Sequence, residues 1–194
     1  MTDYKIRIAE PGDAESIFKI YGPYIEHTVI TFEYEMPSLH EFADRIREIA
    51  SFYPYLVYEA EGKICGYAYA HRQMERAAYQ WNTELSVYVD KEAKGKGIGK
   101  ALYGTLLEIL KRQNMRNVYA GVTYPNERSE SLHRHFGFEL LGVYHHTGYK
   151  FGKWHDVMWF EKSLNDGQRK PQPVRSVQDL GMDVIHQICD LHLG

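Results

Sequence analysis

Short runs of alternating apolar and polar residues, separated by helical patterns, organise this sequence. Residues 5–8 alternate with the period of a half-buried strand, and the turn Pro11-Gly12-Asp13 ends the run. Asp13 is placed to cap a helix that starts immediately afterwards. The buried face of that helix is predicted to consist of Ile17, Ile20, Tyr21 and Tyr24.

A capping box predicts where a second helix begins. Ser38 and Glu41 have the spacing at which each side chain accepts a hydrogen bond from the main-chain N–H of the other residue. Phe42, Ile46 and Ile49 follow at helical spacing and predict the buried stripe of this helix. Two helices are therefore expected before the main run of strands.

The chain from residue 55 to residue 160 predicts strands interrupted by two further helices. The elements are strands at 55–60, 64–70 and 83–89, a helix after residue 99 with an apolar face of Leu102, Leu106, Ile109 and Leu110, a strand at 118–122, a helix at 127–136, and strands at 138–144 and 157–160. This order predicts an α/β architecture, an α+β mixed sheet with helices on its faces.

The chain is predicted to divide near residue 165. Residues 1–164 form one domain in this interpretation, and residues 165–173 are polar and turn-rich, as in a linker. Apolar positions between residues 177 and 191 predict a helix that docks on the body or on a partner subunit, with disorder as the alternative. We therefore expect residues 165–194 to be a linker and a tail.

Composition excludes several classes of function. The chain has 194 residues, the length of one domain, and its formal net charge of −3 gives little attraction to nucleic acid or to an anionic membrane. Cys65 and Cys189 lack the spacing of a zinc site or a disulfide scaffold, which favours a reducing, cytoplasmic location. The first 20 residues lack the apolar stretch of a signal peptide, and no apolar run reaches the ~20 residues that span a bilayer.

Tyrosine is unusually frequent, with 16 tyrosines against 8 phenylalanines. This excess is typical of half-exposed strands, where the ring is buried and the hydroxyl group stays in water. An aromatic-lined pocket for a small polar ligand is the alternative. Strand packing is favoured for most of them, and Tyr79 and Tyr88 are the two expected to face a bound ligand.

A glycine-rich segment follows the strand at 83–89 and opens the next helix. Gly95, Gly97 and Gly99 allow a ligand to approach the main chain, and free N–H groups at a helix N-terminus bind anions. The positive side chains around them are Lys94, Lys96 and Lys100. The spacing fits neither the dinucleotide fingerprint nor the P-loop, and a flexible connecting loop is the remaining alternative.

These residues carry a resemblance to a known family. Val87-Tyr88-Val89 followed by Lys94-x-x-Gly97-x-Gly99 resembles the acetyl-CoA motif of the GNAT N-acetyltransferases, which have Gln or Arg at the position of Lys94. Residues 126–138, an Asn-led helix that ends in Gly-Phe, resemble the second block of the family. Across residues 4–163 the resemblance narrows to the phosphinothricin acetyltransferase subfamily, mainly through residues 81–89 and 148–157.

The resemblance implies a fold and a reaction. The fold is the GNAT acyl-CoA N-acyltransferase fold, a central, mostly antiparallel sheet flanked by helices. The reaction is direct attack by the amino group of a small amino-acid-like acceptor, of the phosphinothricin, methionine sulfoximine or methionine sulfone class, on the thioester of acetyl-CoA. Subfamily membership also implies a homodimer. The alternatives are a GNAT enzyme for a polyamine or a protein N-terminus, and a non-catalytic CoA-binding module.

The same resemblance implies catalytic roles. Glu84 corresponds to the catalytic glutamate of the subfamily, which takes the proton of the attacking amine, and a solvated strand carboxylate is the alternative. His133 occupies the position of the proposed general acid, and packing against the cofactor is its alternative. Main-chain N–H groups near Val89 are the expected oxyanion donors.

Binding residues follow in the same way. The predicted acetyl-CoA contacts are Val87, Tyr88, Val89, Lys94, Gly95, Lys96, Gly97, Ile98, Gly99, Lys100, Asn126 and, more weakly, His135. The predicted acceptor pocket comprises Phe32, Arg76, Ala77, Ala78 and Tyr79. Arg76 suits bidentate binding of a carboxylate, with a solvated loop arginine as the alternative. No metal is expected, because the adjacent His145 and His146 point to opposite faces of a strand.

Overall fold

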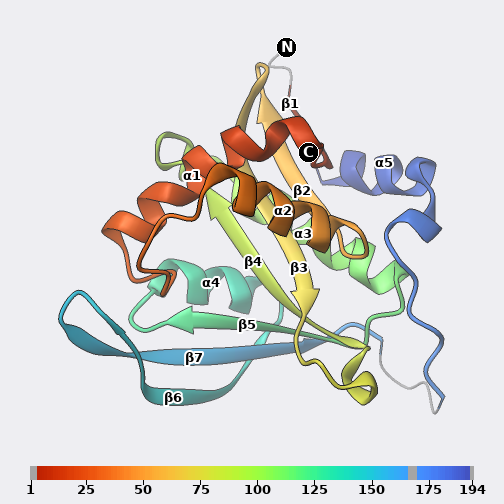
Figure 1. Ribbon diagram of the computed structural model, residues 1–194. Helices are drawn as coiled ribbons and strands as arrows, with labels where there is room; N and C mark the ends of the chain where they lie inside the picture. The colour runs from red at the N-terminus through yellow and green to blue at the C-terminus, as the bar shows by residue number, and fades with distance from the viewer. Residues whose placement is uncertain (1–3, 166–169, 193–194) are drawn as a thin grey trace.

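One sheet carries the described part of the protein, residues 4–165 and 170–192 (Figure 1). In the computed structural model the seven strands of this sheet follow the order β1-β2-β3-β4-β5-β7-β6. They are β1 (Tyr4–Ile8), β2 (Tyr55–Ala60), β3 (Lys63–Arg72), β4 (Asn82–Val89), β5 (Asn117–Thr123), β6 (Glu139–Lys150) and β7 (Lys153–Ser163). All neighbouring strands are antiparallel except β4 and β5, which confirms the predicted mixed sheet.

The parallel contact between β4 and β5 is short. It ends at Glu84, which lies opposite Tyr119. β4 then continues to Val89 and β5 to Thr123 without pairing further with each other, and the two strands diverge in Figure 1. Beyond this fork at Glu84 and Tyr119, the edge of β4 therefore has main-chain groups that no neighbouring strand satisfies.

Helices cover both faces of the sheet. α1 (Ala14–His27) and α2 (Leu39–Ala50) pack on one face, and α3 (Ile98–Arg112), α4 (Glu127–His135) and α5 (Met182–Leu191) pack on the other. Side chains alternate across a strand, so neighbours in β2 separate: Leu56 lies in the α3 cluster, and Val57 in the α1 and α2 cluster. Among the described helices, none has the length and apolar composition that crossing a membrane requires.

The first two helices are capped differently. The capping box of α2 is confirmed, because Ser38 Oγ accepts from the Glu41 N–H at 3.2 Å and the Glu41 carboxylate accepts from the Ser38 N–H at 2.8 Å. The predicted side-chain cap of α1 is wrong. Asp13 instead binds Arg7 of β1 at 2.6 and 2.9 Å and the Glu10 N–H at 2.7 Å. The pair with Arg7 engages both carboxylate oxygens with a cation, whereas a cap would engage the carboxylate with one main-chain N–H.

The last hairpin is longer than its pattern predicts. The strands expected at 138–144 and 157–160 extend to Lys150 in β6 and begin at Lys153 in β7. The register shifts between Tyr144 and Gly148, where His146 has a φ of 51°. Such a bulge interrupts the two-residue alternation, so the sequence pattern ends before the strand does.

The tail contains α5, which packs against α3 and β1. The Gln113 side-chain amide joins the preceding segment to the body, because it donates to the Arg175 carbonyl at 2.8 Å. The residues of α5 that become buried are Ile185, Ile188 and Cys189. Residues 166–169 of the predicted linker and residues 193–194 of the tail lie outside the described residues.

Candidate active site

Glu84 lies where β4 and β5 separate. It is the last residue of β4 that pairs with β5, and on its other side it pairs with His71 of β3. Glu84, Ser86 and Tyr88 share one face of β4, and the Tyr88 ring packs edge-on against Tyr21 of α1 at 5.1 Å. The Glu84 side chain therefore faces the α1 and α2 side. Burial raises the pKa of Glu84 above its usual value, and His71 opposes that rise.

The open edge of β4 presents the main-chain groups of Val87 and Val89. The Asp90 N–H donates to the Cys65 carbonyl of β3 at 2.8 Å, and main-chain groups alternate between the two edges of a strand, so Val87 and Val89 face the opposite edge. There the Tyr24 hydroxyl donates to the Val89 carbonyl at 2.7 Å and accepts from the Val89 N–H at 3.4 Å. The apolar pattern places Tyr24 on the buried face of α1 but gives no sign of this polar contact.

The glycine-rich loop connects β4 to α3. Gly95 and Gly97 have φ values of 87° and 82°, a left-handed conformation that strains other residues. Gly97 precedes α3 without a side-chain cap, so the first N–H groups of the helix remain available to an anion. Lys94 Nζ lies 5.0 Å from the centre of the Tyr24 ring. The exposed cationic side chains around the loop are Lys94, Lys96 and Lys100.

His133 lies in an aromatic box and is only 4% exposed. Its ring packs edge-on against Tyr103 and Phe138, at 5.4 and 5.3 Å, and is stacked on Phe160 at 5.3 Å. Its Nδ1 lies 2.6 Å from the Ser129 carbonyl, and burial lowers the pKa of His133 against the opposing effect of that hydrogen bond. A neutral ring that donates its Nδ1–H to the main chain has no proton at Nε2, so these contacts favour packing over proton donation.

Asn126 and His135 lie at the two ends of α4. The Asn126 side-chain oxygen accepts from the Ser129 N–H at 3.2 Å and thereby caps the helix. The amide nitrogen of Asn126 can still donate to a ligand. His135 is exposed in the last turn, where its ring lies edge-on to Phe136 at 5.1 Å. The structure thus leaves both side chains with polar atoms free for the contacts that the resemblance implies.

The predicted acceptor residues lie in two places. Phe32 precedes α2 and packs towards β7, with its ring centre 6.2 Å from that of His155. The exposed turn of Arg76, Ala77, Ala78 and Tyr79 joins β3 to β4. Figure 1 shows this turn at the lower right and the segment that precedes α2 at the left. The structure therefore does not bring the two parts of the predicted pocket together within one chain.

A cavity lies between α1, α2 and the sheet, and none of its lining residues was predicted as a site residue. It measures about 50 Å³, room for a few water molecules and too little for an amino acid. Arg45 lies 2.7 Å from Glu33 in its wall, and the Tyr21 hydroxyl also donates to Glu33 at 3.2 Å. The tyrosine excess is the one sequence signal for it. Its lining residues are Tyr21, Glu33, Phe42, Arg45, Ile46, Ile49, Tyr55, Tyr67 and Tyr69.

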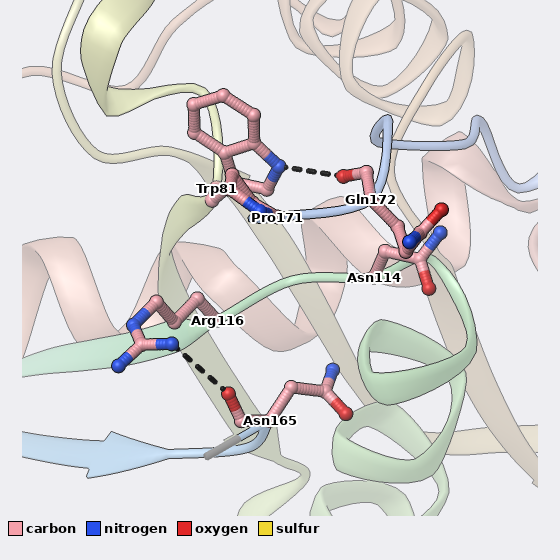
Figure 2. Close-up of a pocket in the computed structure, with 6 residues that line it drawn as sticks. All are labelled: Trp81, Asn114, Arg116, Asn165, Pro171 and Gln172. Carbon is pink, nitrogen blue, oxygen red and sulfur yellow. Dashed lines mark hydrogen bonds between the residues drawn. The ribbon is translucent and has the colours of Figure 1, made fainter. Parts of the chain in front are cut away.

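A second hollow lies where the tail crosses the start of β4 (Figure 2). The Trp81 indole N–H donates to the Gln172 carbonyl at 2.8 Å, and Arg116 donates to the Asn165 carbonyl at 3.3 Å. These contacts fasten the tail to the body. The hollow measures only about 10 Å³, the space of one water molecule, so we do not assign it a substrate.

The adjacent histidines of β6, His145 and His146, bind Asp156 of β7 within the hairpin. His145 Nδ1 lies 3.0 Å from an Asp156 carboxylate oxygen, and the His146 N–H donates to the other oxygen at 2.8 Å. Within residues 4–165 and 170–192, no group of three or more His, Cys, Asp or Glu side chains is arranged to hold a metal ion.

Comparison with known proteins identifies the family. A model of the acetyltransferase (GNAT) domain matches residues 6–159 of this chain. The chain belongs to the GNAT acetyltransferases. This finding confirms the resemblance that the residues around Gly97 and Asn126 indicate, and it makes the protein an N-acetyltransferase enzyme.

The relatives of this GNAT chain agree in sequence and in fold. The phosphinothricin N-acetyltransferase of Streptomyces viridochromogenes is 34% identical over 176 residues, which cover 91% of this chain and 96% of that protein. The L-methionine sulfoximine/L-methionine sulfone acetyltransferase of Pseudomonas aeruginosa is 30% identical over 86% of this chain and 98% of its own. A GNAT phosphinothricin acetyltransferase from Sinorhizobium meliloti, solved in complex with AcCoA, has a TM-score of 0.84 and 38% identity, covering 87% of this chain and 93% of that one.

Two parts of this GNAT site fit acetyl-CoA, the co-substrate of the family. The uncapped N-terminus of α3 and the lysines around it suit its phosphates. The open edge of β4 offers the N–H and C=O groups of Val87 to its amide-bearing arm, and the Val89 groups next to them are bonded by the Tyr24 hydroxyl. Acetyl-CoA supplies an acetyl group already activated as a thioester. Glu84 lies at the fork where that open edge begins.

Proposed function

We propose that this GNAT enzyme acetylates the α-amino group of a small amino-acid-like acceptor, of the phosphinothricin, methionine sulfoximine or methionine sulfone class. The observation that carries the proposal is the position of Glu84. A carboxylate at the fork, with a pKa raised by burial, adjoins the open edge of β4 and faces the α1 and α2 side. Several relatives that span most of this chain are named for acceptors of these classes.

Glu84 accepts the proton of the acceptor in this proposal. An ammonium group has no lone pair, so it must lose a proton before its nitrogen can attack a carbonyl carbon. A raised pKa makes the Glu84 carboxylate a better proton acceptor near neutral pH than an exposed glutamate is. In this proposal, main-chain N–H groups near Val89 stabilise the negative charge that develops on the carbonyl oxygen of the acetyl group.

The proposed acetyl-CoA contacts divide between main chain and side chains. Val87, Tyr88 and Val89 contribute strand main chain, and residues 94–100 contribute the phosphate-binding loop. Asn126 and His135 approach from α4. His133 supports α4 through its aromatic contacts in this proposal, and the proton-donor role is kept as the alternative that a His133→Gln variant tests.

The experiment is a thiol-release assay with acetyl-CoA and a panel of amino acids and their sulfone, sulfoximine and phosphinic analogues. We expect turnover with at least one analogue, and a fall in kcat of about 10²–10³-fold in Glu84→Gln. The KM for acetyl-CoA should stay within about twofold. Glu139→Gln, an exposed change at the start of β6, is the matched control. Turnover restricted to polyamines or to peptide N-termini would replace the proposed acceptor class.

Direct attack, without an acyl-enzyme, has its own test. Cys65 is half-buried and its Sγ lies 3.5 Å from the Lys63 carbonyl, while Cys189 is buried in α5, where burial raises the pKa of its thiol to about 11. Neither thiol has a histidine within hydrogen-bonding distance in the described residues. Cys65→Ala should therefore keep nearly full turnover, and loss of all activity would contradict direct transfer.

We propose further that the enzyme is a homodimer. β6 forms one edge of the sheet, and its apolar side chains Leu140, Leu141, Val143 and Tyr144 are all exposed. An exposed apolar edge strand is a surface that a second copy can cover. Light scattering after size exclusion should give twice the 22.7 kDa chain mass, and Leu141→Lys should reduce it to one chain.

Two further proposals concern the domain division of the chain and its location in the cell. We place the acetyltransferase domain in residues 1–164 and treat residues 165–194 as a linker and an appended tail. We also propose a cytoplasmic location, because both cysteines are free thiols. Fractionation of the producing cell tests the location.

A further inference from the structure

The segment between α1 and α2 is irregular, but hydrogen bonds attach it to β5 and β6 of the sheet. We define it as residues 28–34, the acceptor-side segment, because it contains Phe32. No helix or strand runs through it. Irregular segments have few main-chain hydrogen bonds of their own, so their shape depends on contacts with their surroundings.

Lys150 at the end of β6 provides the first of these contacts. The residue is only 2% exposed, and its Nζ donates to the Ile25 carbonyl at 2.7 Å and to the Thr31 carbonyl at 2.8 Å. Ile25 lies in the last turn of α1, where carbonyl groups lack helical partners and where a cation is favoured. One amine therefore joins the end of α1, the acceptor-side segment and β6.

Gly148 provides the second contact. A Cβ atom at this position would overlap the ring of Phe32, so the ring can lie against the strand only because residue 148 has no side chain. The φ of Gly148 lies outside the left-handed region, which leaves space as the reason for glycine here. His155 supports the arrangement, because its ring lies 6.2 Å from that of Phe32 and its Nε2 lies 3.1 Å from the Lys150 carbonyl.

Two further hydrogen bonds complete the attachment. The Thr123 hydroxyl, at the end of β5, donates to the Val29 carbonyl at 2.7 Å. The Tyr34 hydroxyl donates to the Tyr149 carbonyl of β6. The acceptor-side segment is thus held at both its ends and in its middle by strands that lie beyond the fork.

We infer that Lys150 is a positioning residue for the acceptor: it holds the acceptor-side segment in the shape that presents Phe32 to the amino-acid-like substrate. This inference rests on the proposed function. Burying a lysine amine removes it from water, and an apolar side chain would fill the same space without that loss. The two carbonyl contacts are what an apolar residue could not supply. One fixes the acceptor-side segment at Thr31, and the other fixes the last turn of α1, from which the segment starts.

A purely structural role for Lys150 predicts something different. It would lower stability and change all kinetic constants together, or change none of them. Positioning of the acceptor predicts a split, in which the KM for the acceptor rises while the KM for acetyl-CoA does not, because the glycine-rich loop and the open edge of β4 do not touch Lys150.

The test compares Lys150→Met with wild type and with changes at two glycines of β6. Lys150→Met keeps a side chain of similar length and removes its hydrogen-bond donors. We expect the KM for the acceptor to rise about tenfold or more in Lys150→Met and in Gly148→Ala, with the KM for acetyl-CoA within about twofold. Gly142→Ala is the matched control, because a Cβ there would meet nothing within 4 Å. Thr123→Val gives a milder version of the same split if Lys150→Met does not fold.

Hydrogen exchange measured by mass spectrometry supplies a readout that needs no activity. Peptides that cover residues 28–38 should exchange faster in Lys150→Met, while peptides from α3 should not change. Active variants whose KM for the acceptor is unchanged would overturn the inference and leave the proposed function in place. A wild-type protein that turns over none of the acceptors would overturn the proposed function, and with it the acceptor role of Lys150. The exchange data would then still decide whether Lys150 holds the acceptor-side segment in place.

Discussion

The two faces of the sheet are built from different kinds of side chain. Under α3 the buried cluster is mainly aliphatic, with Leu102, Leu106, Ile109 and Leu110 fully buried. Under α1 and α2 it is rich in tyrosine, and the rings of Tyr55, Tyr67, Tyr69 and Tyr88 stack in pairs, with ring centres 4.9 to 6.3 Å apart. The first face also buries a few polar groups, among them the Tyr103 hydroxyl and the His133 ring. The second face differs in bringing a whole group of stacked tyrosines into the interior.

This difference follows the chemistry of the two sides. Two hydroxyl groups of the tyrosine face make polar contacts: Tyr24 binds the Val89 main chain, and Tyr21 binds Glu33 in the wall of the small cavity. Burial raises the pKa values of Tyr55, Tyr67 and Tyr88 well above the usual tyrosine value, so these hydroxyl groups stay neutral donors. The aliphatic face stabilises the fold, and the tyrosine face shapes the surroundings of Glu84.

The largest expected effect is a loss of stability when a buried side chain of the aliphatic face is removed. Leu106→Ala removes a fully buried side chain, and the cavity it leaves should lower the free energy of unfolding by about 2–5 kcal/mol. The KM values of the remaining folded enzyme should not change, because Leu106 touches neither the loop nor the fork. Denaturant unfolding and steady-state kinetics check both expectations. Leu191→Ala, at a leucine that is 74% exposed, is the matched control and should change stability by less than about 0.5 kcal/mol.

A smaller effect tests the tyrosine face. Tyr24→Phe keeps the ring and removes only the hydroxyl that binds Val89, so the free energy of unfolding should fall by about 1 kcal/mol. The KM for acetyl-CoA should change by about threefold or more, because the freed Val89 groups belong to the proposed binding edge. Tyr4→Phe, which removes an exposed hydroxyl on β1, should change neither quantity. If Tyr24→Phe lowers the free energy of unfolding but leaves the KM for acetyl-CoA unchanged, Tyr24 is a packing residue only.

The smallest effect is a shift along the pH axis. Glu84 must be ionised to accept a proton, and burial raises its pKa, so kcat should fall as pH drops through a value above the usual range of glutamate. The same shift means that the folded state favours the protonated form, and the stability that Glu84 contributes grows as pH falls through the raised pKa. The kcat profile of wild type, and the loss of its acid limb in Glu84→Gln, check this expectation.

Local patterns predict much of this fold. The strand at 55–60 matches β2 residue for residue, the Ser38 box caps α2, and the apolar stripe after residue 99 is the buried face of α3. Each of these features depends on neighbours within a few residues, so spacing alone contains the information. The glycine-rich loop belongs with them, because left-handed φ values at Gly95 and Gly97 are a local requirement.

Only the tertiary structure decided the contacts that join distant parts of the chain. Tyr24 meets Val89 across 65 residues, and Lys150 meets Ile25 across 125 residues. The Asp13 side chain pairs with Arg7 instead of capping α1, and Phe32 lies against Gly148. The segment that precedes α2 lies apart from the turn between β3 and β4 (Figure 1). The sequence by itself determined most of the elements, the family and the glycine-rich loop before α3. Which polar groups face one another across the fork depends on how the strands diverge, and that is a property of the assembled sheet.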